Sequence, residues 1–417
     1  MKKIELLAPA GNLAKMATAF LYGADAVYLG IPDFSLRVRI NDFDLKSLRE
    51  AVAYAHKKQK KVYVTVNIFA HNKHLKKLPT YLKILKNLKA DALIISDPGI
   101  LNLTKKYCPR IPIHLSTQAN CTNSEAVKFW AKQGVERIIL GREVTLTEIK
   151  EIKKIVPKIE LEYFVHGAMC MAYSGRCFLS KELVDRSANL GDCAQPCRWP
   201  YEVTIKAEKR ADVFELVEEN HGAYLLNSKD LCLVKHLPEL IKAGVTSFKI
   251  EGRAKSIYYL ATIVGIYKAA LLETQKVGSG ANTNKKSALS KKLNYFSQEL
   301  KTKIINRGYT SGFLLNDKAA QNTTDSHNKV AWEFCGQVLA SAAGLVLVKV
   351  HNTILGGSII EIISPNYDII RLKLNRLWDY KSQAEIKEAH GGGGGQMIIF
   401  ELEAKIPAGS VLRRKLL

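Results

Sequence analysis

The sequence predicts an α/β fold: a (β/α)8 TIM-like barrel with a cysteine-bearing insertion, followed by a small C-terminal all-β domain that is barrel-like. Three observations lead to this prediction. Short runs rich in β-branched and aromatic residues alternate with helical stretches through the first 270 residues. The seventh run is followed by an unusually long segment that contains four cysteines. Beyond about Val330 the helical stretches cease, and short alternating strands take their place.

Eight runs are the candidate strands of the barrel. They are IELL (4–7), AVYLG (26–30), VYVTVN (62–67), ALIIS (92–96), IPIHLS (111–116), RIILG (137–141), IELEYFV (159–165) and TSFKI (246–250). Amphipathic segments such as LAKMATAFLYGA and NSEAVKFWAKQG separate them and end on glycine or a small residue. Continuous apolar strands joined by helices form parallel sheets, and eight of them close a barrel. An open doubly wound sheet is the alternative.

The expected boundaries follow from changes in composition. We place the barrel at 1–272 with its cysteine-rich insertion at 167–224, a linker and helical extension at 273–329, and the β domain at 330–417. Within the insertion, YEVTIKA and FELVEE alternate and predict a hairpin. The polar segment TQKVGSGANTNKKSALSKK is expected to be a flexible surface connection.

The net charge points to a polyanionic partner. Lys and Arg number 62 against 39 Asp and Glu, which leaves +23. Nucleic acid is the commonest polyanion that such a surface meets, although a lysine-rich proteome would also give this count. No run approaches twenty apolar residues, so no membrane span is expected. The start, MKKIELLAPAGN, does not read as a signal peptide, and we expect a cytoplasmic protein.

Polar residues follow six of the eight candidate strands. Because active sites of such barrels lie at the carboxyl ends of the strands, these side chains are expected to converge on one mouth. Singly, each is more often a cap or a loop hydrogen bond. They are Asn67, Asp97, Gln118, Arg142 with Glu143, His166, and Glu251 with Arg253.

Four cysteines lie close together in the insertion: Cys170, Cys177, Cys193 and Cys197. A reducing cytoplasm disfavours disulfides. Structural zinc sites use close pairs at both ends, whereas only the last two cysteines are so close, and an iron–sulfur cube accepts dispersed thiolates. Spacing leaves zinc and iron–sulfur open. A thiolate nucleophile activated by His166 is a further alternative.

The same stretch resembles a known family. Glu162, Phe164, Gly167, Ala168, Cys170, Gly175, Cys177 and Ser180 match the signature of the U32 peptidase family. ELLAPAGN, GADAVYLG, HLSTQAN, CRWPY and KIEGRAKS are also similar to that family, over about residues 4 to 315. Within it, FVHGAMCMAYSGRC, NSKDL and RGYTSGF resemble the branch that hydroxylates the wobble uridine of tRNA to 5-hydroxyuridine with prephenate.

The resemblance implies a [4Fe–4S] cluster on Cys170, Cys177 and Cys193, with Cys197 as the fourth ligand. A related branch that hydroxylates ubiquinone precursors takes its last ligand farther along, so Cys232 is the alternative. The implied partners are tRNA, a small acidic co-substrate such as prephenate, and an electron-donor protein. Ribosomal RNA and a peptide are alternative substrates. The peptidase label has little support, because no Ser–His–Asp set or HExxH motif is present.

Site roles can then be assigned as hypotheses. The two carboxylates of the co-substrate suit the guanidinium groups of Arg37, Arg142 and Arg253, with Asn67, Gln118 and Glu251 beside them. His166, Tyr173 and Glu162 are the candidates for catalysis by proton transfer. Aromatic and basic residues near the insertion and the later segment are expected to contact RNA. These are Arg198, Trp199, Lys255, Arg307 and Tyr309.

Overall fold

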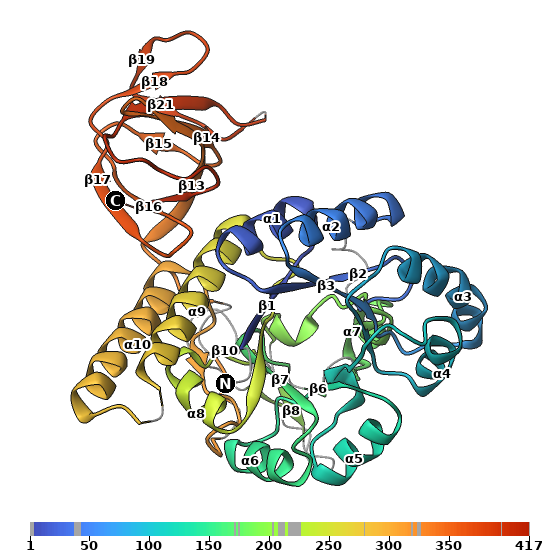
Figure 1. Cartoon of the computed structure of the whole chain (residues 1–417). Helices are drawn as coiled ribbons and strands as arrows, with labels where there is room; N and C mark the ends of the chain where they lie inside the picture. The colour runs from blue at the N-terminus through green and yellow to red at the C-terminus, as the bar shows by residue number, and fades with distance from the viewer. Residues whose placement is uncertain are drawn as a thin grey trace. The chain divides into compact units, whose positions relative to one another are not determined.

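A computed structural model shows the chain as two compact units (Figure 1). It describes residues 4–36, 43–170, 172–173, 176–201, 204–206, 213–215, 227–278, 280–317, 320–322, 327–392 and 394–416. The first unit comprises Met1–Leu13, Ala26–Arg253 and Asn306–Asn328. The second comprises Ala14–Asp25, Ala254–Ile305 and Lys329–Leu417. Each unit is therefore assembled from segments that are distant in the sequence.

The eight predicted barrel strands are all present, and they form a closed parallel barrel. Each strand pairs with the next, and β11 (Val245–Ile250) pairs in parallel with both β7 (Glu160–Gly167) and β1 (Glu5–Pro9) to close the ring. The prediction of a barrel is confirmed, and the open sheet is excluded. The strands are β1 (Glu5–Pro9), β2 (Ala26–Gly30), β3 (Lys61–Val66), β4 (Ala92–Ile95), β5 (Ile113–Leu115), β6 (Arg137–Ile139), β7 (Glu160–Gly167) and β11 (Val245–Ile250).

Helices of the first unit alternate with these strands (Figure 1). They are α2 (Leu45–Lys57), α3 (Asn72–Asn87), α4 (Pro98–Tyr107), α5 (Ser124–Lys132), α6 (Leu146–Ile155) and α8 (Leu237–Lys242). Side-chain oxygens of Asp44, Asp97, Asn123 and Thr145 accept backbone N–H groups at the starts of α2, α4, α5 and α6. Among the helices that the structure describes, none is long and apolar enough to cross a lipid bilayer.

The insertion after β7 contains short elements and a strand that returns to the barrel. It begins with α7 (Leu179–Val184), η3 (Ala188–Leu190) and η4 (Pro196–Arg198). The expected hairpin is present, because β8 (Thr204–Lys206) pairs antiparallel with β9 (Val213–Glu215). Strand β10 (Asp230–Cys232) then pairs antiparallel with β7, and β12 (Tyr309–Thr310) pairs with β10. Two strands therefore extend the sheet beside the carboxyl end of β7.

The second unit carries helices and the predicted all-β domain. Its helices are most of α1 (Leu13–Leu21), α9 (Ile257–Val277) and α10 (Thr283–Lys303). One expectation is corrected here: the polar segment expected to be a flexible connection contains the start of α10. Asn282 caps that helix, and Leu289, Leu293, Phe296 and Leu300 form a buried stripe at helical spacing.

The β domain is an eight-stranded antiparallel sheet that encloses an aliphatic core. The strands in spatial order are β17 (Ile369–Lys373), β16 (Ile359–Ile363), β22 (Val411–Lys415), β13 (Trp332–Ala342), β14 (Leu345–Val350), β21 (Met397–Glu401), β18 (Leu377–Asp379) and β19 (Glu385–Ile386). A small pair, β15 (Ile354–Leu355) with β20 (Glu388–Ala389), completes it. Alternate residues such as Val346, Val348 and Val350 point into the core, as the sequence pattern predicted.

Arg413 on β22 is fully buried in this unit. Its Nε donates to Glu361 Oε2 at 2.7 Å, and its Nη2 donates to Glu299 Oε2 at 2.6 Å. Glu361 lies on β16 and Glu299 on α10, so one guanidinium ties two strands to the helix. Buried charges are tolerated in a core only when they are paired in this way.

Candidate active site at the barrel mouth

The carboxyl ends of β3 and β5 place Asn67 and Gln118 together. Asn67 Nδ2 donates to Gln118 Oε1 at 3.0 Å and to Ser116 Oγ at 3.2 Å. The Ser116 hydroxyl also donates to Gln118 Oε1. Gln118 lies on the short helix η2 (Thr117–Ala119) that follows β5. The expected convergence of these two residues is therefore present. Asp97, in contrast, caps α4 by accepting from Ile100 N at 2.9 Å.

Arg142 forms a second polar group at this mouth. Its guanidinium donates to the Glu251 carboxylate and to the Ala168 carbonyl, and it lies 4.2 Å from the centre of the Phe164 ring. Burial alone would lower the pKa of Arg142, but the charges of Glu251 and Cys170 outweigh it and raise that pKa, so the group stays charged. Its Nε is buried without a hydrogen-bond partner in the part of the chain that the structure describes. A buried donor of this kind suits an anionic ligand.

Arg253 follows β11 and is directed at the segment after β2. Its Nη1 donates to Ser35 Oγ at 2.7 Å and lies 3.4 Å from Thr65 Oγ1, and its Nη2 donates to the Leu36 carbonyl. These bonds tie Arg253 to the Ser35 side chain and the Leu36 carbonyl. The third arginine expected to bind the co-substrate, Arg37, lies outside the described residues.

A network of buried charges fills the barrel beneath the mouth. Lys249 Nζ donates to Glu162 Oε1 at 2.8 Å, and Arg137 Nη1 donates to Glu162 Oε2 at 3.2 Å and also to Glu5. Ser247 Oγ donates to both carboxylates. Burial lowers the pKa of Lys249, although Glu162 opposes that shift. From the sequence, Glu162 is the one member of this network that we predicted as a site residue. The others could have been found as charged residues within otherwise apolar strand segments.

The candidate proton-transfer residues occupy different environments. His166 is 2% exposed, and its ring lies 5.4 Å from the Tyr309 ring, centre to centre. Tyr173 is 54% exposed. Glu162 is fully buried in the charge network just described. His166 pairs in register with Cys232 on β10, which places the alternative cluster ligand beside the candidate histidine.

Three of the four clustered cysteines share one electrostatic environment. Burial raises the pKa of Cys197; among nearby charges, Arg198 and Arg307 oppose the rise, and Cys170 and Cys193 add to it. For Cys177, the described contact is through its backbone N–H, which donates to Asn189 Oδ1 at 3.1 Å.

The donor set fits a group bound through thiolate sulfur. The donors are soft, and the arginines beside them offset negative charge. Among the described residues, however, no three His, Cys, Asp or Glu side chains are arranged to hold a metal ion. The described residues therefore bring Cys170 and Cys193 within electrostatic reach of Cys197 but do not form a finished ligand set.

Of the five residues expected to contact RNA, one is buried, two are half-buried and two are exposed. Arg307 is 7% exposed, and its Nη2 donates to Asp230 Oδ1 at 2.6 Å. Arg198 donates to the Gln195 side chain, and burial together with the Arg307 charge lowers its pKa. Of the five, Trp199 and Lys255 are exposed, and Lys255 belongs to the second unit, with its Nζ over the Tyr259 ring.

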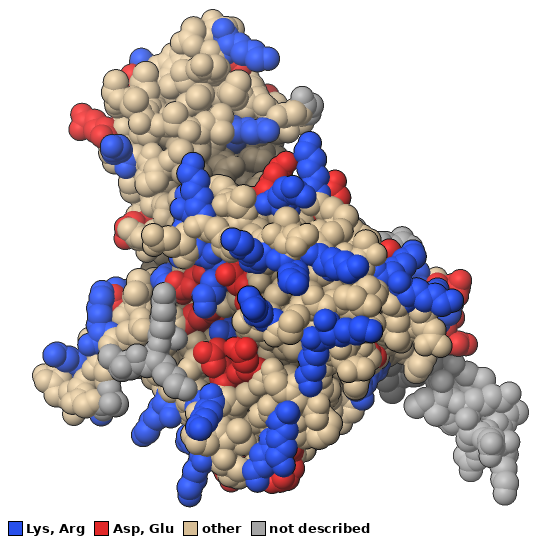
Figure 2. Space-filling model, turned by 45° about the vertical axis from the view of Figure 1, so that its right-hand side comes forward, with Lys and Arg blue, Asp and Glu red and all other residues tan. Residues whose placement is uncertain are grey.

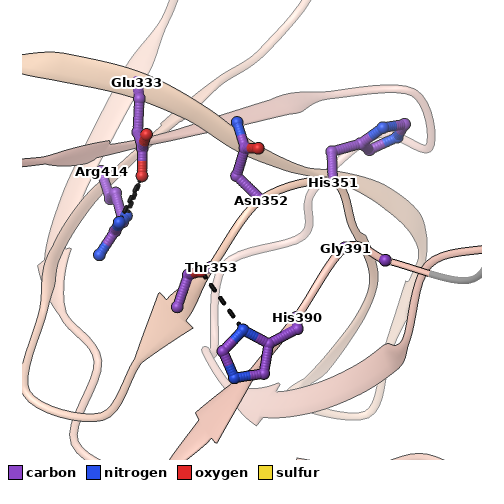
Figure 3. A pocket seen from close by; sticks show the side chains of 8 residues that line it. Glu333, His351, Asn352, Thr353, His390, Gly391 and Arg414 are labelled. Atoms are coloured by element: carbon purple, nitrogen blue, oxygen red, sulfur yellow. Dashed lines mark hydrogen bonds and ion pairs between the residues drawn. The ribbon is translucent and has the colours of Figure 1, made fainter.

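The β domain has a polar cavity of its own, of about 290 Å³ (Figure 3). Glu333 pairs with Arg414 on one side, and Thr353 Oγ1 lies 3.4 Å from His390 Nδ1 on the other. His351 and Asn352 from the end of β14 complete the rim with Gly391 and Gly392. None of the residues predicted to form the site lines this cavity, so the barrel mouth stays the candidate active site.

A closed (β/α)8 barrel with polar side chains at its mouth and a cysteine-bearing insertion after β7 defines the class of this protein. The model of peptidase family U32 matches residues 11–324, and the model of the U32 C-terminal domain matches residues 331–413. The chain therefore belongs to peptidase family U32.

Curated relatives match over most of the chain. tRNA hydroxylation protein P of Escherichia coli is 38% identical over 416 residues, covering 88% of each chain. tRNA hydroxylation protein P1 of Bacillus subtilis is 35% identical over 417 residues, covering 99% of this chain and 95% of the relative. The 23S rRNA 5-hydroxycytidine C2501 synthase of Escherichia coli is 39% identical over 269 residues, covering 64% of this chain and 39% of the relative.

Proposed function

We propose that this protein is a tRNA hydroxylase that converts the wobble uridine to 5-hydroxyuridine. The observation that carries the proposal is the match to tRNA hydroxylation proteins from distant bacteria along nearly the full length of both chains. The net charge of +23 supports a polyanionic substrate. The proposal places the protein in the cytoplasm with its tRNA.

The proposed cofactor is a [4Fe–4S] cluster held by Cys170, Cys177, Cys193 and Cys197. When bound, such a cluster supplies one-electron transfer chemistry, which an electron-donor protein would sustain. The nearby Arg198 and Arg307 would offset the negative charge of the thiolates. The chain itself orients this segment through backbone contacts, such as the Cys177 N–H bond to Asn189.

Prephenate is the proposed co-substrate, and Arg142 is the side chain best suited to bind it. The Nε of Arg142, which has no hydrogen-bond partner among the described residues, offers a donor to a carboxylate, while Glu251 and the Ala168 carbonyl hold the guanidinium in place. Asn67 and Gln118 add amide groups at the same end of the barrel. His166, buried beside Tyr309, is the candidate for proton transfer.

Ribosomal RNA is a second candidate substrate. The relative named as a 23S rRNA synthase supports it, but this chain matches only 39% of that relative's length. A peptidase, which the family name suggests, is the weaker candidate, because the described charged groups inside the barrel are paired with one another in a buried network.

Nucleoside mass spectrometry tests the proposal. The gene would be expressed in a bacterial strain whose tRNA lacks 5-hydroxyuridine, and tRNA and rRNA would be digested separately. Restoration of 5-hydroxyuridine in tRNA is the expected result. Hydroxylation confined to rRNA would favour the second candidate, and gelatin cleavage by purified protein with unmodified RNA would favour the peptidase.

A further inference from the structure

Helices α3 and α4 of the barrel unit present seven exposed lysines. Lys73, Lys76, Lys77, Lys83 and Lys86 lie on α3, and Lys105 and Lys106 lie at the end of α4. We call this set the α3–α4 lysine surface. In α3 the buried residues are Leu78, Leu82 and Leu85, so the apolar face is turned inward and the lysines outward. The view in Figure 2, in which the α3–α4 side of Figure 1 comes forward, shows lysine and arginine side chains spread over this face.

The two helices form one continuous surface. The Cys108 thiol, which directly follows α4, donates to the Leu82 carbonyl of α3 at 2.9 Å. Lys83 Nζ from α3 and Lys106 Nζ from α4 lie 5.9 and 5.7 Å from the centre of the same Tyr107 ring. Two ammonium groups from different helices therefore lie around one aromatic side chain.

Acidic side chains do little to neutralise this surface. Neither Asn72–Asn87 nor Pro98–Tyr107 contains an Asp or a Glu. The flanking Asp97 accepts the backbone N–H of Ile100, and Asp91 accepts that of Val62. Among the described residues, the ion pair that these lysines make is that of Lys77 with Asp33, at 3.8 Å and exposed to solvent. Exposed pairs of this kind contribute little.

The chemistry of the surface favours RNA phosphates over a lipid surface. Helices that lie on membranes turn large apolar side chains outward beside their lysines. No exposed large hydrophobic residue occurs in α3 or α4, both of which the structure describes completely. Lysine ammonium groups act as point charges for phosphate without reading base sequence.

We propose that the α3–α4 lysine surface binds the sugar–phosphate backbone of the substrate RNA. This inference rests on the proposed function, because it takes the RNA to be the substrate tRNA. It also relocates the binding site, since Arg307 is buried and paired with Asp230, and the half-buried Arg198 donates to Gln195. With a rise of about 1.5 Å per residue, the 16 residues of α3 span roughly 24 Å, enough to follow several phosphates.

The salt dependence of tRNA binding tests this inference. The full chain with Lys73→Gln, Lys76→Gln and Lys83→Gln would be compared with wild type by filter binding between 50 and 300 mM KCl. Losing three phosphate contacts should lower the slope of log K against log[KCl] by about 2 to 3 and weaken binding at 50 mM by about tenfold or more. The matched control carries Lys150→Gln, Lys154→Gln and Lys158→Gln, which remove the same charge from exposed lysines near Glu148 and Glu151.

The outcomes separate the inference from the proposed function. A control that changes the slope as much as the α3 variant would overturn the α3–α4 assignment while tRNA hydroxylation stands. The assignment would also be wrong if the α3 variant kept wild-type tRNA binding but lost binding to anionic lipid vesicles. If the wild-type protein fails to bind tRNA at 50 mM KCl, the proposed function itself, with tRNA as the substrate, would be wrong.

Discussion

Lys249 Nζ lies 2.8 Å from Glu162 Oε1 inside the barrel, and both side chains are almost completely buried. Glu162 also accepts from Arg137 and Ser247, so its two oxygens face three donors. The pair lies below a mouth that contains Arg142 and Glu251.

Replacing Lys249 by Met should destabilise the protein. The change leaves the Glu162 carboxylate with a weaker set of partners, and removing one member of a buried ion pair costs about 3 to 5 kcal/mol. Because Arg137 remains, we expect the lower end of that range. Urea unfolding of the variant measures the loss. Lys268→Met, which breaks a half-exposed pair with Asp25, is the control and should cost less than about 1 kcal/mol.

The same variant has a distinct pH dependence. Since burial lowers the pKa of Lys249, the unfolded chain binds this proton more tightly than the folded chain does. Wild-type stability relative to Lys249→Met should therefore rise as pH increases from 7 towards the ordinary lysine value of 10.5. If the stability difference between wild type and Lys249→Met stays constant or shrinks over this range, the ion pair with Glu162 raises the pKa of Lys249 by at least as much as burial lowers it.

Much of the barrel could be predicted, because buried parallel strands are continuous apolar runs that can be read locally. Asn67 and Gln118 were also predictable, since each directly follows a strand and such ends meet at one rim. The Arg137–Glu5 pair joins residues 132 positions apart, and no local pattern reports on such a contact. The aromatic residues near Arg307 in the sequence predict an RNA contact, but the side chain pairs with Asp230, 77 positions away, and is buried.

Alanine variants of the cysteines should distinguish the cluster ligands. After anaerobic purification, Cys170→Ala, Cys177→Ala, Cys193→Ala and Cys197→Ala should each lose most of the bound iron, because one thiolate ligand is removed. Cys232→Ala should keep it, and Cys121→Ala, which changes a buried thiol elsewhere in the barrel unit, is the control. Full iron content in Cys197→Ala together with loss in Cys232→Ala would move the fourth ligand to β10.

The alkylation rate of Cys197 should depend steeply on pH in iron-free protein. Burial raises the pKa of this thiol, and the thiolate is the reactive form. Labelling by iodoacetamide should therefore increase about tenfold per pH unit up to pH 9 and beyond, where an ordinary thiol begins to level off. Peptide mass spectrometry follows each cysteine separately. Cys335, which is fully buried in the β domain, should stay unlabelled and so report that the fold is intact. If the labelling rate of Cys197 levels off below pH 9, the charges of Arg198 and Arg307 lower the pKa of this thiol by more than burial raises it.

Replacing Arg413 by Met should lower the free energy of unfolding of the second unit. The guanidinium is fully buried between Glu361 and Glu299, so its removal leaves two inward carboxylates without their main partner. We expect a loss of about 3 to 5 kcal/mol in urea unfolding followed by tryptophan fluorescence. Arg376→Met, whose pair with Glu385 is exposed and 4.0 Å long, should change stability by less than about 1 kcal/mol. Adding Glu361→Gln and Glu299→Gln to Arg413→Met should recover part of the loss, because the two carboxylates that lost Arg413 are then replaced by neutral amides. Equal stability of the Arg413 and Arg376 variants would mean that the aliphatic core alone holds β16, β22 and α10 together.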